Sequence, residues 1–223
     1  MKLTTNLKAL TAAAVLAVPA MAPTMASAEV GYSANISSMY LWRGQNVSDG
    51  APALSGSIDY SHESGAYAFA WMSSEGVSAS VADPTGAPGD TLDDPDGEEV
   101  DFGVGYAGEA GPLSYDISYY TFNYPAESSH GEETVISLGY EMASLTVYIG
   151  DDYEYTTVGA EFGPASVTYG MTSNDGGADY THIDLSYAAT DSLSFTVSLP
   201  SDDGADISEE PLVMMSYDLP IGK

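Results

Sequence analysis

Residues 181–199 read THIDLSYAATDSLSFTVSL, and this stretch decides the fold. Its first half alternates Ile183, Leu185 and Tyr187 with polar residues, and its second half alternates apolar residues with Ser and Thr. A period of two places the apolar side chains on one face of a β-strand and the polar ones on the other. The stretch therefore predicts two antiparallel strands joined by a tight turn at Thr190–Ser192.

The same alternation recurs along most of the chain, and no segment shows a convincing helical period. Strands are expected near residues 30–43, 53–60, 66–73, 99–106, 113–122, 133–141, 144–150, 155–162, 165–173, 179–188, 193–199 and 211–217. Such a strand content suits a membrane-spanning barrel better than an ordinary globular domain. The sequence predicts an all-β fold, an antiparallel up-and-down transmembrane β-barrel of about twelve strands.

The connections between the predicted strands alternate in length. Long acidic connections such as 74–98 and 200–210 alternate with tight turns such as Gly163–Pro164. Outer-membrane barrels have long loops on the outside of the cell and short turns in the periplasm. An even number of strands then brings both ends of the barrel to the periplasmic side.

Aromatic residues are frequent near the ends of the predicted strands. Such rings favour the headgroup zone of a membrane, so we expect them on the apolar outer face. The members of this expected girdle are Tyr32, Tyr40, Trp42, Tyr60, Tyr67, Trp71, Tyr106, Tyr140, Phe162, Tyr187 and Tyr217.

The first 28 residues have the features of a secretory signal peptide. Lys2 and Lys8 give a positive start to a short apolar run, and Ala26-Ser27-Ala28 supplies a small-residue cleavage pattern. The run is too short to cross a membrane as a helix. We expect residues 1–28 to be a signal peptide and residues 29–223 to form one barrel domain in the bacterial outer membrane.

The chain is strongly acidic, with 33 Asp and Glu against four Lys and Arg and a formal net charge of −29. After the expected signal peptide only Arg43 and Lys223 are basic. This balance excludes nucleic acid as a partner, because binding phosphate needs positive charge. It is compatible with bound divalent cations, a cation-attracting surface or a saline habitat. The absence of Cys excludes disulfides and zinc–thiolate sites.

Residues 38–74 contain a Tyr-x-x-Arg-Gly element at Tyr40–Gly44, then a polar loop, Pro52-Ala53 and Asp59-Tyr60. This combination resembles the start of the TorF-like porin family of proteobacteria. The resemblance implies a signal-bearing outer-membrane barrel with no defined substrate. Its expected partners are outer-membrane lipid, the barrel-insertion machinery and small ions or solutes.

The alternation of the strands also predicts which polar side chains face the lumen. Arg43 is expected on the inner face of the first strand, at a height similar to that of Asp101. There it would either define a constriction in the bore or form a structural ion pair with Asp101 that holds the first loop. The residues predicted to line the channel are Arg43, Asp59, Asp101, Asp116, Glu141, Glu161, His182 and Asp184.

A barrel of twelve strands lies between filled barrels of about eight strands and open porins of about sixteen. We therefore predict a narrow, cation-preferring channel for ions or small solutes, with the loop Ser74–Glu98 as a candidate plug. Within this loop Asp94-Pro95-Asp96-Gly97 has some features of a calcium loop, but the EF-hand spacing is absent. A solvated acidic loop is the preferred interpretation.

Catalytic signals are weak in this sequence. The three histidines, His62, His130 and His182, show no metal-ligand spacing, and no nucleophile and base are paired by a recognised motif. The sequence predicts no enzyme activity, metal or cofactor, and it indicates no oligomeric state. Two alternatives stay open: a soluble, secreted or periplasmic, acidic β-sandwich that binds a ligand, and a plugged structural barrel.

Overall fold

The computed structural model describes residues 28–48, 50–74, 98–125, 129–175, 179–203 and 207–221. Within these ranges the regular structure is entirely β. The strands are β1 (Glu29–Ser37), β2 (Leu41–Trp42), β3 (Gln45–Asn46), β4 (Ala53–Ser61), β5 (Ala66–Ser73), β6 (Glu99–Ala110), β7 (Leu113–Tyr124), β8 (Ser129–Tyr140), β9 (Ala143–Ile149), β10 (Tyr153–Phe162), β11 (Ala165–Asn174), β12 (Asp179–Ala188), β13 (Leu193–Asp203) and β14 (Leu212–Asp218). These residues include no helix with the length and hydropathy that a membrane span requires.

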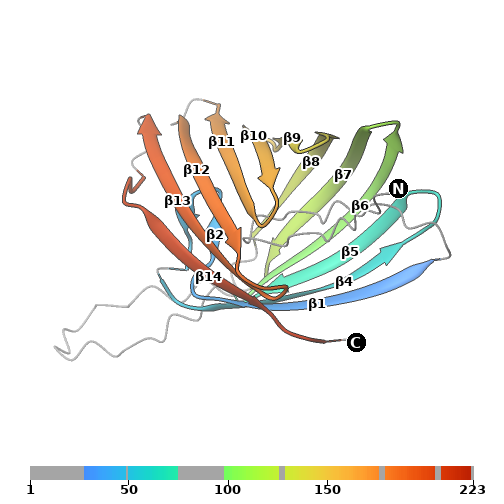
Figure 1. Cartoon of the computed structure of the whole chain (residues 1–223), viewed down its shortest axis with the longest axis horizontal. Helices are drawn as coiled ribbons and strands as arrows, with labels where there is room; N and C mark the ends of the chain where they lie inside the picture. The colour runs from blue at the N-terminus through green and yellow to red at the C-terminus, as the bar shows by residue number, and fades with distance from the viewer. Residues whose placement is uncertain are drawn as a thin grey trace.

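Twelve of these strands form one closed antiparallel barrel (Figure 1). From β4 to β14 each strand pairs with its neighbours in sequence, and β1 pairs with both β4 and β14. The predicted all-β, up-and-down barrel of about twelve strands is thereby confirmed. The β-sandwich alternative is wrong, because a sandwich needs two separate sheets packed face to face.

The two ends of the barrel differ in their connections. At one end, called here the turn end, Gly111-Pro112 and Gly163-Pro164 each join two strands, and their glycines have φ of 65° and 66°. A left-handed first residue suits a two-residue hairpin, and glycine adopts it without strain. The longer connections lie at the opposite end, the loop end. β1 begins and β14 ends at the turn end.

A small hairpin departs from the predicted first strand, which was expected to continue to residue 43. β1 instead ends at Ser37, and β2 and β3 form a separate two-stranded sheet after it. The hairpin turns at Arg43 and Gly44, whose φ values are 47° and 82°, as a two-residue type I′ turn requires. Ser48 stabilises its base: its hydroxyl lies 2.7 Å from the Tyr40 amide, which donates to it.

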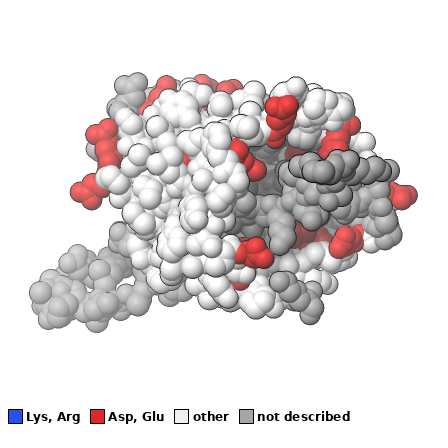
Figure 2. Space-filling model, in the orientation of Figure 1, with Lys and Arg blue, Asp and Glu red and all other residues white. Residues whose placement is uncertain are grey.

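The outer face of the barrel carries large apolar side chains from all twelve strands. Representative residues, each 40–61% exposed, are Ile36, Ile58, Met72, Val104, Ile117, Leu138, Leu145, Val158, Tyr169, Leu185, Phe195 and Val213. The view in Figure 2 shows red carboxylates at its edges and around the hollow near its middle, with white surface between them and no blue atoms of Lys or Arg. The wall therefore has an apolar outer surface, as a strand pattern of period two on a closed sheet demands.

Several aromatic residues expected in the outer girdle lie inside the barrel instead. Tyr67 and Trp71 pair in register with Gly105 and Asp101 of β6 and face inward with them. A Cβ added to Gly105 would lie 2.3 Å from the Tyr67 ring, so this ring covers the glycine. Tyr40 and Trp42 also lie inside, because their segment folds into the lumen. Alternation alone therefore did not identify the face of every ring.

The barrel closes through a short seam between β1 and β14. Only three residue pairs are in register there, against nine between β1 and β4. Side chains reinforce the seam, since the Asn35 amide donates to Ser216 Oγ at 2.7 Å and to Asp218 Oδ1 at 2.8 Å. Closure thus depends on Asn35 as well as on the backbone ladder.

We expect Asn35→Ala to lower the free energy of unfolding by about 1–3 kcal/mol, because it removes two hydrogen bonds, one of them to a carboxylate. The matched control is Ser33→Ala, which removes a hydroxyl contact of β1 on the well-paired β4 side. Urea unfolding of the barrel in detergent micelles measures both. A loss for Asn35→Ala no greater than that for the control would contradict the role of Asn35 in the seam.

Candidate functional site

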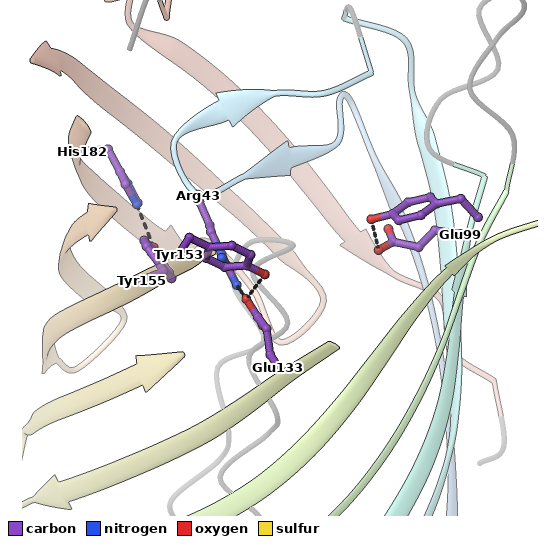
Figure 3. Close-up of polar contacts among 7 residues, drawn as sticks. Arg43, Glu99, Glu133, Tyr153, Tyr155 and His182 are labelled. Carbon is purple, nitrogen blue, oxygen red and sulfur yellow. Dashed lines mark hydrogen bonds and ion pairs between the residues drawn. The ribbon is translucent and has the colours of Figure 1, made fainter. Parts of the chain in front are cut away.

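The hairpin tip carries Arg43 into the interior of the loop end (Figure 3). The Arg43 side chain is 5% exposed and forms an ion pair with Glu133 of β8. The Tyr153 hydroxyl donates a 2.6 Å hydrogen bond to the same carboxylate oxygen. A buried guanidinium is stable only with such a partner, so this ion pair holds the hairpin tip against the wall.

Aromatic rings surround the Arg43 guanidinium. Its Cζ lies 4.4 Å from the ring centroids of Trp42 and Tyr155, 5.1 Å from that of Tyr148 and 5.4 Å from that of Tyr153. Each distance is within the range of a cation–π interaction. Three of these rings come from β9 and β10, and only Trp42 comes from the hairpin. The wall itself therefore presents an aromatic cage with a carboxylate at its edge.

A second polar chain supports the cage from β12. Asp184 Oδ1 lies 3.0 Å from His182 Nδ1, and His182 Nε2 lies 2.8 Å from the Tyr155 hydroxyl. All three side chains are buried. His182 also stacks on the Tyr155 ring at 5.9 Å. This chain fixes the orientation of Tyr155, one of the two rings closest to the guanidinium.

The hairpin base is anchored to a different strand, β6, which is separated from β8 by β7. Tyr40 donates a 2.7 Å hydrogen bond to Glu99 Oε2, and Tyr124 donates to Glu99 Oε1 at 3.0 Å. Burial raises the pKa of Tyr40 well above its usual value, and the Glu99 carboxylate raises it further. Tyr40 therefore stays protonated and keeps donating its hydrogen bond. The hairpin is held at two points, one at its base and one at its tip.

Five of the residues predicted to line the channel lie on the inner face of a strand as expected. They are Asp59, Asp101, Asp116, His182 and Asp184. Asp59 and Asp116 lie toward the turn end, where Ser57 and Ser118 donate to them at 2.5 Å and 3.0 Å. Asp101 lies near the loop end and is fully buried.

The other predicted positions need correction or qualification. Arg43 does not lie on the first strand, and its partner is Glu133 and not Asp101, because the inward hairpin carries it across the lumen. Glu141 is not on a strand face: it is an exposed residue of the β8–β9 turn with φ of 53°. Glu161 occupies an inner position of β10 but is exposed beside the turn end.

The segment expected to plug the bore was 74–98, of which residues 75–97 lie outside the described residues. The described segment that enters the lumen is the shorter hairpin. The sequence reasoning also missed Glu133, Tyr153 and Tyr155. A signal was available, because Leu41 and Trp42 are large apolar residues directly before an Arg-Gly pair, which suggests a tight turn whose strands are buried.

The turn-end half of the inner wall has a different character. Apart from Asp59, Asp116 and Tyr67, its inner positions carry mainly small or hydroxyl side chains such as Ser33, Ser57, Ser114 and Ser144. Ser33, Ser114 and Ser144 are exposed, so solvent reaches this part of the wall. The interior therefore combines a densely packed aromatic half with a hydroxyl-lined, water-accessible half.

Gly44 fits closely against the wall at the hairpin tip. A Cβ added there would lie 2.6 Å from His182 Cβ and Cγ, and the φ of 82° already disfavours an L residue. We expect Gly44→Ala to unseat the tip and to lower the free energy of unfolding by about 2–4 kcal/mol, from backbone strain plus overpacking.

The matched control for Gly44→Ala is Gly50→Ala. Gly50 has a similar φ of 78°, but the nearest atom to its added Cβ is 3.9 Å away. It should therefore lose only the strain contribution, about 1–2 kcal/mol. Thermal unfolding in micelles compares the two variants. Equal losses would mean that the tip does not pack tightly on His182.

Comparison with known proteins places the chain in a family but assigns no activity. No curated protein matches it. A family model described as a bacterial protein of unknown function (Gcw_chp) matches residues 21–221, which include every described strand. The chain belongs to this bacterial family, Gcw_chp.

Proposed function

We propose that this protein is an outer-membrane channel of the porin type, related to the TorF-like porins, that passes small cations or small solutes. The observation that carries the proposal is the closed barrel with an apolar outer face on every strand and an inner face that carries several carboxylates. Two further features support it: the signal peptide expected at residues 1–28 and the hairpin that partly fills the lumen.

The outer face supports a membrane location. A contiguous exposed apolar surface around a whole domain is unfavourable in water, whereas lipid covers it. A closed barrel also pairs all its strands, which the hydrocarbon region requires. Outer-membrane lipid and the barrel-insertion machinery are therefore the proposed partners.

The inner face supports a preference for cations. Carboxylates of Asp59, Asp116 and Asp184 lie on it, and the charge of Arg43 is offset by Glu133. Charge on the wall of a narrow pore concentrates ions of opposite sign. Net negative charge inside the barrel thus favours cations over anions.

A second candidate function is a structural barrel that does not conduct. The burial of Tyr40, Leu41 and Arg43, each at most 4% exposed, favours it, because the hairpin is packed into the loop-end half of the lumen. In the channel proposal the same hairpin is a constriction. The two candidates differ in whether ions pass beside the seated hairpin.

Location is tested by fractionation of the source bacterium. We expect the mature protein to begin at Glu29, after Ala26-Ser27-Ala28, and to resist carbonate extraction from outer membranes, because the apolar belt lies in lipid. Sequencing of the N-terminus and immunoblots of the fractions measure this. Recovery as a freely soluble periplasmic protein would contradict the membrane proposal.

Conduction is tested with the purified protein in planar bilayers. The wild type should prefer cations, and the preference should weaken at high salt because the Debye length falls from about 10 Å at 0.1 M to about 3 Å at 1 M. Arg43→Ala should raise the conductance by removing the side chain that joins the hairpin to the wall. Asp59→Asn, which leaves the hairpin untouched, should lower cation preference without this rise.

The outcomes separate the candidates. Conductance only in Arg43→Ala would favour the plugged structural barrel. No conductance in either form, from protein shown to be folded, would contradict the channel proposal. Anion preference in the wild type would contradict the electrostatic argument.

A further inference from the structure

The cage around Arg43 is built mainly from the barrel wall and not from the hairpin that fills it. Glu133 comes from β8, Tyr148 from β9, and Tyr153 and Tyr155 from β10. β8 pairs with β7 and β10 pairs with β11 over their whole lengths, and β9 pairs with both β8 and β10. The chain from Asp184 through His182 holds Tyr155 in place. The wall part of the site is therefore preorganised without Arg43.

The carboxylate of this cage requires a cation. Glu133 is 1% exposed; its Oε1 accepts from Arg43 and Tyr153, whereas its Oε2 is buried with no hydrogen-bond partner among the described residues. A buried carboxylate without a cation is strongly destabilising. Removal of Arg43 would thus leave a preformed site with an uncompensated charge and unused acceptor capacity.

The chemistry of the cage suits a guanidinium group. This planar cation stacks on aromatic faces, is weakly hydrated and donates several hydrogen bonds in one plane. The Tyr148, Tyr153 and Tyr155 rings supply the faces, and the Glu133 carboxylate supplies the acceptors. An ammonium ion is a compact and strongly hydrated charge that uses such a flat cage less well.

The hairpin that carries Arg43 into the cage does not take part in the backbone pairing of the barrel wall. β2 and β3 form their own sheet, and the barrel strands described here do not pair with it. Side-chain contacts at Arg43 and at Tyr40 hold the hairpin in the lumen. Exchange of the occupant therefore needs no strand of the barrel to open.

Solvent reaches the lower part of the same wall segment. Between the cage and the turn end, inner positions of β8, β9 and β10 carry mostly small side chains, and the lowest of them are exposed or partly exposed. These residues are Ser137, Gly139, Ser144, Thr146 and Gly159. Solvent from the turn end therefore reaches these positions, and the buried Val135 and Thr157 lie between them and the cage.

We propose that this wall cage is a binding site for small guanidinium-bearing solutes, and that Arg43 occupies it as a built-in competitor. A solute that takes the site displaces the hairpin tip. The inference names the solute class of the proposed channel and rests on that function for its route of entry, but binding itself does not require conduction.

Chemical rescue tests the proposal with the full chain folded in micelles. Guanidinium chloride at about 20 mM, far below the molar range in which it denatures proteins, is compared with sodium and ammonium chloride at equal ionic strength. Arg43→Ala should melt at a temperature that rises saturably with guanidinium by roughly 2–5 °C, as expected for a ligand of the native state. The wild type should show a much smaller rise.

The matched control is the double variant Arg43→Ala with Glu133→Gln, which keeps the rings but removes the charge. It should lose the guanidinium effect. An equal rise with sodium or ammonium, an equal rise in the double variant, or no rise in Arg43→Ala would each overturn the proposal. If Arg43→Ala does not fold, Arg43→Gln replaces it and refolding yield becomes the readout, with equal yields in guanidinium and sodium overturning the proposal.

Bilayer recordings of the same Arg43→Ala protein separate this inference from the proposed function. Guanidinium at millimolar concentration should reduce the current when added on the turn-end side. Rescue of stability in a barrel that carries no current would support the binding site and contradict the channel. Current without any guanidinium effect on stability or conductance would support the channel and overturn the binding site.

Discussion

Closure of a twelve-strand sheet is the constraint on which the rest of this structure depends. Once β1 meets β14, each strand has one face toward the surroundings and one toward a bore, so a sequence of period two gives an apolar exterior and a polar interior. The bore of such a barrel is too wide for the small side chains of the turn end to fill. At the loop end, the hairpin of β2 and β3 folds inward and fills this space.

The hairpin brings a charge into the interior, and this charge organises the packing there. Arg43 reaches Glu133 across the lumen, and tyrosines from β9 and β10 shield the ion pair from water. Because separating a buried ion pair leaves an uncompensated charge, which is strongly destabilising, the pair fixes where the tip sits. Gly44 has the same effect sterically, since only a residue without Cβ fits against His182.

The sequence predicted the barrel well, because strand period and turn spacing are local signals that closure preserves. Inner positions such as Asp59, Asp116 and Asp184 followed from parity. The position of Arg43 could not be predicted in this way, because the alternating pattern continues to residue 43 although β1 ends at Ser37. Its contact with Glu133 spans 90 positions of sequence, and such a pairing depends on the inward path of the hairpin. The prediction for Glu141 was wrong for a simpler reason. This residue lies in the β8–β9 turn, and the alternation of inner and outer positions applies only within a strand.

The small number of basic residues determines how Arg43 pairs inside the barrel. Most carboxylates have no nearby cation in the sequence, yet the one basic residue within the described barrel is buried beside Glu133. A surface arginine would have been screened by solvent and would have met many acidic partners equally well. Inside the lumen it has one partner of matched height and geometry. The scarcity of basic residues thus makes the single interior pairing unambiguous.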